Sequence, residues 1–268
     1  MNLTTRDIRN VVLLGHSGSG KTTFAETMLY ESGAITRRGH IEGKNTVSDY
    51  TNIEQERGNS IFSTLMNVHW RSNKINIIDT PGYDDFVGEV ISSLKVADTA
   101  MILLNGASGV EVGTELIWEY VQEFNTPALF IINKCDHEKL DYESTIDQAR
   151  KRFGNKVLPI QMPYFDEEGN FCIIDALRMT MYVFGPKGGK PTKVQIPAVQ
   201  MPQAIEMHNA LVEAAAENED GLMEKYFEEG SLDESDLAKG LTIALANQEI
   251  YPVSVSYTHL TLPTTPYV

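Results

Sequence analysis

Near the N-terminus the sequence reads Gly15-His16-Ser17-Gly18-Ser19-Gly20-Lys21-Thr22, which fits the pattern G-x-x-x-x-G-K-[ST] of a phosphate-binding loop. Glycines in such a loop let successive backbone N–H groups turn inward around a polyphosphate. We expect the Lys21 ammonium to reach the β- and γ-phosphates and the Thr22 hydroxyl to bind Mg²⁺. The stretch, together with Thr23, therefore predicts a site for a nucleoside triphosphate and its magnesium ion.

The residues on either side of the loop support this interpretation. Residues 11–14 are apolar and rich in β-branched side chains, which predicts a buried strand, and residues 23–30 carry apolar side chains at helical spacing. A strand, a glycine-rich loop and a helix N-terminus together form an anion site. A chance match to the four fixed positions is expected in roughly one per cent of chains of this length, and these flanks reduce that chance further.

The composition is that of an ordinary globular protein. Of the 268 residues, 42% are hydrophobic and 22% are charged, and no apolar run approaches the roughly 18 residues of a membrane span. The net charge of −15 argues against a broad nucleic-acid-binding face; an acidic surface that keeps the protein soluble is a simpler interpretation than a basic partner. Two cysteines and a polar N-terminus favour a reducing cytoplasm.

Beyond the loop, apolar runs alternate with amphipathic segments. Strands are predicted over residues 61–68, 74–78, 101–104 and 128–132, and helices over 84–97, 111–124 and 138–153. This alternation predicts an α/β fold of the P-loop NTPase class, with a mainly parallel sheet covered by helices. Such sheets bind ligands beyond the carboxyl ends of their strands, so the loops at 15–22, 79–83 and 133–136 should converge. Residues 32–58 show no period and predict a long functional loop.

The second of these loops reads Asp79-Thr80-Pro81-Gly82. An acidic residue at the carboxyl end of a strand can hold Mg²⁺, usually through water, and Gly82 lets its backbone N–H approach a terminal phosphate closely. Residues 79–82 are therefore predicted to contact the nucleotide, with Asp79 on its metal ion.

The third loop reads Asn133-Lys134-Cys135-Asp136. The Asp136 carboxylate can accept two hydrogen bonds from the N1–H and exocyclic amine of guanine, whereas adenine has no matching amine. An unpaired buried carboxylate costs several kcal/mol, which is ample for selection. Alone, N-K-x-D could be a solvated turn. After the third apolar strand that follows a phosphate loop, Asn133, Lys134 and Asp136 predict guanine binding and disfavour an ATP-dependent enzyme.

The pattern changes after about residue 155. Strands are predicted over residues 157–184 with a hairpin turn at 166–170, then helices over 202–227 and 232–250, the second with a capping box at Ser231 and Glu234, and a last strand over 251–255. We interpret 155–245 as an α+β subdomain inserted in a domain of residues 1–255. Residues 256–268 are rich in Thr and Pro and are expected to be a non-native or disordered tail.

These motifs together resemble the translational GTPases, and specifically the elongation factor G group. The resemblance covers about residues 5–255 and is carried by GHSGSGKTT at 15–23, DYTNIEQERGNSI at 49–61, DTPGY at 79–83 and NKCD at 133–136. It implies binding of GTP or GDP with Mg²⁺, and GTP hydrolysis coupled to movement of tRNA and mRNA on the ribosome. Full members of the group continue with a β-barrel and three further domains.

Four positions depart from the group's pattern. Gly18 replaces a common Asp, and Gly58-Asn59-Ser60 replaces G-I-T, which leaves the Ser60 hydroxyl as a Mg²⁺ ligand. Tyr83 replaces the His that positions the attacking water, and the S-A motif that contacts guanine is not clear near residues 255–256. The first three departures resemble an elongation factor G-like paralogue group. By this resemblance Tyr83 orients water, with Lys21 and Gly82 as its catalytic neighbours; alternatively, Tyr83 only packs at the start of the next helix.

The sequence thus predicts the GTPase domain of an elongation factor G-like translation factor, with slow hydrolysis in the absence of the ribosome. We expect a monomer that reaches the ribosome mainly through further C-terminal domains and the switch regions, and that binds neither a membrane nor a specific nucleic-acid sequence. Two alternatives stay open: a ribosomal protection or release-factor-type GTPase, and a nucleotide-gated ribosome-binding module that hydrolyses little GTP.

Overall fold

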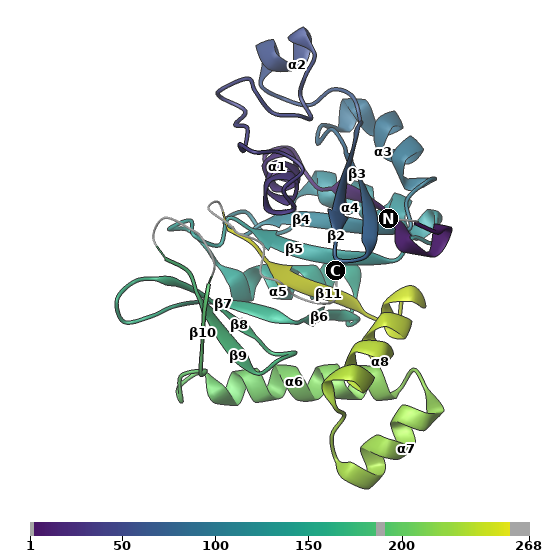
Figure 1. Ribbon diagram of the computed structural model, residues 1–268, viewed down its shortest axis with the longest axis vertical. Helices are drawn as coiled ribbons and strands as arrows, with labels where there is room; N and C mark the ends of the chain where they lie inside the picture. Colours follow the sequence, from purple (N-terminus) through teal and green to yellow (C-terminus); the bar gives the residue numbers. More distant parts are fainter. Residues whose placement is uncertain (1–2, 186–190, 258–268) are drawn as a thin grey trace.

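The main sheet of the protein has seven strands in the order β2-β3-β1-β4-β5-β11-β6 (Figure 1). The computed structural model describes residues 3–185 and 191–257. Neighbouring strands are parallel except β2 and β3, which are antiparallel. The strands are β1 (Ile8–Leu14), β2 (Thr64–Trp70), β3 (Asn73–Asp79), β4 (Thr99–Asn105), β5 (Ala128–Asn133), β6 (Val157–Pro159) and β11 (Tyr251–Val255). The predicted α/β fold with a mainly parallel sheet is confirmed.

Helices cover both faces of this sheet because alternate residues of a strand point to opposite faces. On one face, Val11 and Leu13 of β1 pack in a cluster with Phe24 and Met28 of α1 (Lys21–Glu31). On the other face, Val12 and Leu14 belong to a cluster that includes apolar residues of α3 (Val87–Leu94), α4 (Val112–Glu123) and α5 (Tyr142–Phe153). A short 3-10 helix, η2 (Asp84–Phe86), precedes α3, and another, η1 (Thr5–Asp7), precedes β1.

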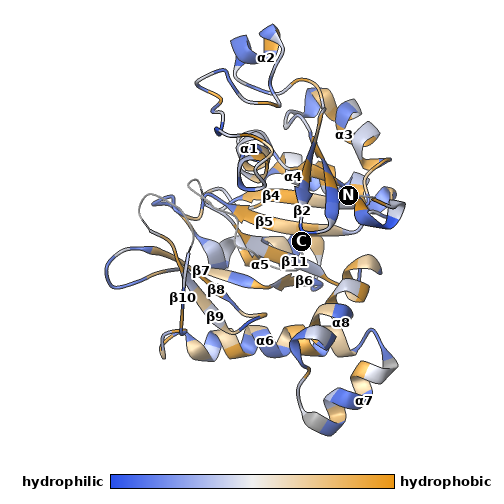
Figure 2. Ribbon diagram, in the orientation of Figure 1, coloured by the Kyte–Doolittle hydropathy of each residue, from blue (hydrophilic) through white to orange (hydrophobic). Residues whose placement is uncertain are grey.

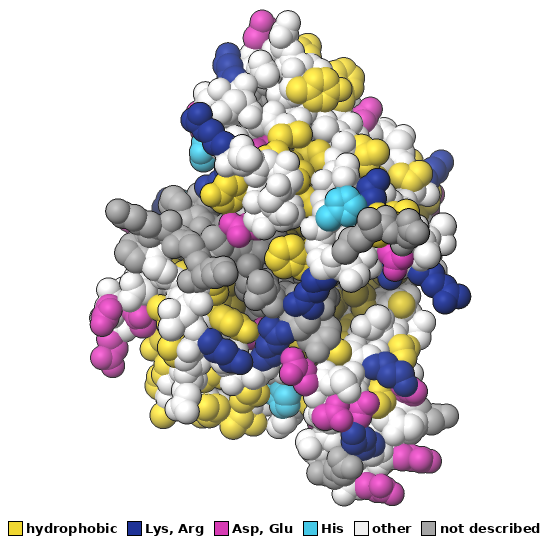
Figure 3. Space-filling view, viewed as in Figure 1, with side chains coloured by type: hydrophobic (Ala, Val, Ile, Leu, Met, Phe, Trp, Pro, Cys, Tyr) yellow, Lys and Arg dark blue, Asp and Glu magenta, His cyan; other side chains and the backbone are white. Residues whose placement is uncertain are grey.

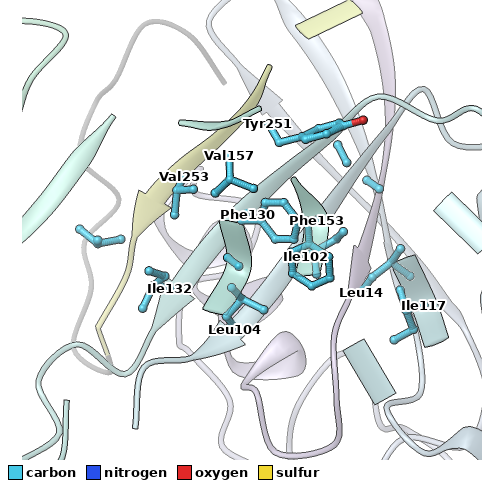
Figure 4. Packing of buried hydrophobic residues seen from close by; sticks show 14 of the residues in the cluster. Leu14, Ile102, Leu104, Ile117, Phe130, Ile132, Phe153, Val157, Tyr251 and Val253 are labelled. Atoms are coloured by element: carbon cyan, nitrogen blue, oxygen red, sulfur yellow. The ribbon is translucent and has the colours of Figure 1, made fainter. Parts of the chain in front are cut away.

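Aromatic rings fill the second face at its centre. The rings of Phe130 and Phe153 stack with centroids 4.8 Å apart, and Trp118 lies 5.0 Å from Phe153 and 4.8 Å from Tyr251. Figure 4 shows Phe130 on its strand meeting Phe153, with Ile102 beside them. This packing joins α4, α5, β4, β5 and β11, so β5, whose end carries the third predicted loop, lies on a rigid base.

A second, antiparallel sheet and three helices follow β6. The sheet has the order β10-β9-β8-β7 and consists of β7 (Gln161–Phe165), β8 (Phe171–Asp175), β9 (Thr180–Val183) and β10 (Thr192–Val194). Its β7–β8 hairpin turn is the one predicted at 166–170, and Asp166 Oδ1 accepts the N–H groups of Glu168 and Asn170 there. The helices are α6 (Met201–Ala216), α7 (Asp220–Glu229) and α8 (Glu234–Ala246). The predicted α+β subdomain is therefore present.

The helices of this subdomain differ from the prediction in two ways. Residues 202–227 form two helices rather than one, because the Asn218 side chain bonds the Ala214 carbonyl and α6 ends at Ala216. The predicted capping box of Ser231 and Glu234 is wrong. Asp233 caps α8 instead, because its Oδ1 accepts the N–H groups of Ser235 and Asp236.

The polar stretch at 32–58 also differs from the predicted loop. It contains α2 (Asn52–Arg57), which begins at a capping box made by Thr51 and Glu54. The predicted helix over 138–153 starts later, at Tyr142, where the Asp141 side chain accepts the Ser144 N–H. Short helices with strong caps lack the repeated apolar period that sequence reading depends on.

Hydropathy follows this architecture (Figure 2). The central strands β4 and β5 are coloured as hydrophobic, whereas polar and apolar residues alternate along α6. Across residues 3–185 and 191–257, no helix has both the length and the apolar character needed to span a bilayer.

Candidate nucleotide-binding site

The phosphate loop joins the end of β1 to the first residue of α1. Three of its glycines have left-handed backbone angles: φ is +138° at Gly15, +78° at Gly18 and +95° at Gly20. Gly20 is also in close contact with the third loop, because a Cβ there would overlap the Asn133 side-chain amide. This position therefore requires glycine for two reasons, its φ angle and the space available.

Lys21 lies inside the loop rather than in solvent. Its ammonium donates to the carbonyls of Gly15 (2.8 Å) and His16 (3.1 Å), and burial lowers its pKa to about 8. Gly82 meets it from the second loop, since a Cβ on Gly82 would lie 2.5 Å from Lys21 Nζ and 2.8 Å from Ser17 Cα. The first and second loops therefore converge around Lys21, as predicted.

Asp79 is the polar centre of the second loop. It is fully buried, and its Oδ2 accepts from the hydroxyls of Thr22 (2.8 Å) and Ser48 (2.6 Å), while its Oδ1 has no partner among the described residues. Burial raises the pKa of Asp79 to about 6. Ser60 Oγ lies 3.2 Å from Thr22 Oγ1. The three predicted metal ligands, Thr22, Ser60 and Asp79, are thus brought together.

Two further residues join this cluster that sequence reading did not single out. Ser48 bonds Asp79, and Asp49 is buried with both carboxylate oxygens unpartnered within the described part of the chain. Burial raises the pKa of Asp49 as well. A polar stretch without a period carries no signal for which of its carboxylates turns inward, so only the fold could identify Asp49.

The remaining residues of the first two loops have supporting contacts. The Thr80 hydroxyl donates to the Leu13 carbonyl (2.7 Å), and Pro81 is buried. His16 Nε2 lies 3.8 Å from Glu111 Oε1 at the start of α4. Tyr83, which follows these residues, is 46% exposed, and its hydroxyl makes no hydrogen bond within residues 3–185 and 191–257.

The third loop meets the first through Asn133. Its side-chain amide donates to the Ser19 carbonyl (2.9 Å), and Lys134 has a left-handed φ of +60°. These two residues line a small cavity of about 70 Å³. The other residues that line it are Gly20, Thr23, Phe24, Thr27, Ser256 and Tyr257.

Asp136 does not line this cavity. It is half-buried and borders a larger cavity of about 580 Å³, together with Tyr142 and Phe165. The place where the S-A motif was sought is taken by Ser256 and Tyr257. Ser256 bonds Ile132 and Cys135 through its backbone, and the Tyr257 ring lies 4.5 Å from that of Phe171. The first two residues of the predicted tail are therefore buried, and residues 258–268 lie outside the described part of the chain.

Comparison with known proteins agrees with this geometry. Residues 6–258 match the family model of the elongation factor Tu GTP binding domain. The crystal structure of a protein from Thermus thermophilus is similar with a TM-score of 0.86 and 30% sequence identity, over 94% of this chain and 37% of that one. This chain thus spans little more than a third of that relative.

Proposed function

The chain belongs to the family of elongation factor Tu GTP-binding domains, a family of translational GTPases, and from this premise we propose that it binds GTP and GDP with Mg²⁺ and hydrolyses GTP slowly until a ribosome accelerates it. The observation that carries the proposal is the meeting of three loops at one edge of the sheet. Lys21 lies against Gly82, Asp79 bonds Thr22, and Asn133 bonds Ser19.

The residues around Asp79 fit a magnesium ion. Asp79 Oδ1 and both Asp49 oxygens are buried acceptors without partners among the described residues, and buried polar atoms normally have one. Thr22, Ser60 and Asp79 would hold the ion, with Asp49 in support, because Mg²⁺ prefers oxygen ligands. Bound Mg²⁺ would neutralise charge on the β- and γ-phosphates. It would also favour the charged forms of Asp49 and Asp79, whose pKa values burial raises.

The phosphate side of the site is formed by this chain's own cations and amides. With a pKa of about 8, Lys21 is mostly protonated at pH 7. Phosphate oxygens would replace the carbonyls of Gly15 and His16 as its acceptors and raise that pKa. The turn at residues 15–20 and the Gly82 N–H would bind the remaining oxygens. These groups would stabilise the charge of the transition state.

We propose that Tyr83 orients the attacking water. A phenol with a pKa of about 10 cannot act as a base near neutrality, but it can donate and accept one hydrogen bond. Its exposure and its lack of a hydrogen-bond partner among the described residues favour this role over core packing, since a buried Tyr would contribute mainly through its ring. Catalysis would then depend on a partner that places the hydroxyl, which is the reason for slow intrinsic hydrolysis.

Guanine is proposed to lie against Asn133 and Lys134, with its N1–H and amine facing Asp136. The small cavity beside Lys134 supplies an apolar wall from Phe24. Because Asp136 does not line this cavity, the loop at 133–136 would have to close on the base. A carboxylate left unpaired by adenine would favour GTP over ATP.

The division of the chain remains part of the proposal. Residues 1–255 would form one GTPase domain, with about 155–245 as its insertion. The predicted tail at 256–268 begins with two residues that are buried against this domain, and the rest of it lies outside the described residues. The departures at Gly18, Asn59 and Tyr83 support the elongation factor G-like paralogue group. We further propose a cytoplasmic monomer whose main partner is the ribosome.

Single-turnover hydrolysis of GTP with and without ribosomes tests this function. We expect a slow rate alone and at least a tenfold increase with ribosomes. Equal rates would contradict the ribosomal role. GTP-dependent binding to ribosomes without hydrolysis would instead support the alternative of a nucleotide-gated binding module.

A further inference from the structure

A buried carboxylate on α1 makes contacts that the proposed chemistry does not use. Glu26 is 1% exposed. Its Oε2 accepts the Gly39 N–H at 2.9 Å and its Oε1 accepts the Val47 N–H. Within the described residues it forms no ion pair, so its charge is balanced by backbone donors. Charge-assisted hydrogen bonds of this kind are about twice as strong as neutral ones.

These two donors mark the beginning and the end of one tight turn. Inside residues 39–47, Asn45 Oδ1 accepts the His40 N–H at 2.8 Å. Gly39 packs against the far side of the turn, since a Cβ on it would lie 2.5 Å from the Asn45 carbonyl oxygen and 2.8 Å from Thr46 Cα. One carboxylate on α1 therefore holds both ends of the turn.

The residues that follow Val47 are those that enter the metal cluster. The Ser48 hydroxyl donates to Asp79, and the Ser48 carbonyl accepts from Thr64 Oγ1 at 3.0 Å. Asp49 lies buried beside them. A shift of the chain at Val47 would thus move Ser48 and Asp49 with it.

We propose that Glu26 is a positioning residue that holds the 39–47 turn against α1 and thereby sets how tightly the chain retains Mg²⁺. The effect on Mg²⁺ retention rests on the proposed function, whereas the anchoring of the turn does not. Glu54 provides an internal reference, because its Oε1 accepts the N–H groups of Ile61 and Phe62 at the other end of the same loop.

Amide hydrogen exchange of Glu26→Gln tests the anchor. Glutamine offers one acceptor oxygen where the carboxylate offers two, so one backbone N–H would face an NH₂ group. We expect at least tenfold faster exchange at Gly39 or Val47, with Ile61 and Phe62 unchanged. Glu42→Gln is the matched control, because this exposed side chain of the same turn carries the same charge. Unchanged exchange at both Gly39 and Val47 would overturn the anchor.

Release of a fluorescent GDP at different Mg²⁺ concentrations tests the positioning role. For Glu26→Gln we expect the Mg²⁺ concentration that half-maximally slows release to rise about tenfold, with no change of the rate in EDTA. Faster amide hydrogen exchange at Gly39 or Val47, with an unchanged Mg²⁺ midpoint for GDP release, would mean a purely structural role and would overturn the proposal. If the unmodified chain binds no guanine nucleotide, the proposed function fails, while the exchange result still decides the anchor. If the Gln variant does not fold, Glu26→Asp gives a second test, because the side chain is one methylene shorter and its carboxylate no longer reaches both N–H groups.

Discussion

The loop edge of the main sheet and the helices α7 and α8 of the inserted subdomain place their charged side chains in opposite environments. At the edge, Lys21 and Asp79 are 6% and 0% exposed. Burial lowers the pKa of Lys21 and raises that of Asp79, which in both cases favours the neutral form. In the subdomain, charged pairs such as Lys239–Glu219 at 2.7 Å stay at the surface. Figure 3 shows acidic and basic side chains intermixed over α7 and α8.

This difference shows which part of the molecule is shaped for a ligand. Exposed ion pairs contribute little to stability, and their charges are solvated without a bound ligand. Buried charges without compensation destabilise the fold, so they persist where a ligand completes them. The loop edge should therefore gain stability when its buried charges are removed, whereas removal of the exposed charges around α7 and α8 should give no such gain.

The largest effect is expected from Asp79→Asn. The pKa of Asp79 is about 6 in the folded chain and 3.8 in the unfolded one. Its contribution to stability is therefore fully present below pH 3.8 and is lost as the pH rises through 6. Without Mg²⁺ at pH 7, the substitution should stabilise the chain by about 3 kcal/mol, measured by urea denaturation.

Two controls accompany this measurement. Denaturation of the unmodified chain should show decreasing stability between about pH 4 and 7 without Mg²⁺, and a weaker dependence when Mg²⁺ and GDP are bound. Asp166→Asn, in the subdomain hairpin, should give no comparable gain. A loss of stability in Asp79→Asn would show that the buried charge is fully compensated by the protein itself.

The next largest effect concerns the base. Asp136→Asn should weaken the binding of GTP by about a hundredfold, or about 2.7 kcal/mol. It should favour a xanthine nucleotide, because the new amide presents a hydrogen-bond donor. Competition against a fluorescent GDP measures both changes. The subdomain variant Asp166→Asn should leave nucleotide preference unchanged; equal loss in both variants would mean that Asp136 acts through general charge.

A smaller effect is expected from Tyr83→Phe, which removes the hydroxyl and keeps the ring. With ribosomes and the full-length protein, the rate of hydrolysis should fall about tenfold, or about 1.4 kcal/mol in the barrier. Tyr226→Phe on α7 is the matched control. If the rate for Tyr83→Phe stays the same, the water is held by another group, such as the backbone near Gly82.

The smallest effect belongs to the subdomain alone. Asp233→Ala should slightly destabilise α8, because it removes the acceptor of two backbone N–H groups. Ser231→Ala should be nearly neutral. Nucleotide affinity should not change in either variant. A lower affinity in Asp233→Ala would show that the two regions are coupled, and thermal unfolding with and without GDP would reveal it.

These regions also differ in how far the sequence predicted them. The strands at the loop edge are short apolar runs, and the loops between them carry spacing that only a phosphate site needs, so the convergence of Lys21, Gly82 and Asn133 could be expected. The hairpin at 166–170 was also predicted, since Asp, Gly and Asn favour a turn.

The errors have physical causes. The break between α6 and α7 depends on one Asn218 side chain, and the cap of α8 falls two residues after the predicted Ser231 because Asp and Ser cap helices almost equally well. Asp49 and Glu26 could not be identified from the sequence because their roles depend on residues distant along the chain. The charge of Asp49 acts on Asp79, and Glu26 accepts the Val47 N–H.

The most direct test of the account is a competition experiment with the unmodified chain and Mg²⁺, in which GTP and ATP each displace a fluorescent GDP. The proposed pairing of guanine with Asp136 predicts displacement by GTP at concentrations at least a hundredfold below those needed for ATP. Displacement by GTP and ATP at equal concentrations would contradict the assignment of this edge of the sheet as a guanine-nucleotide site.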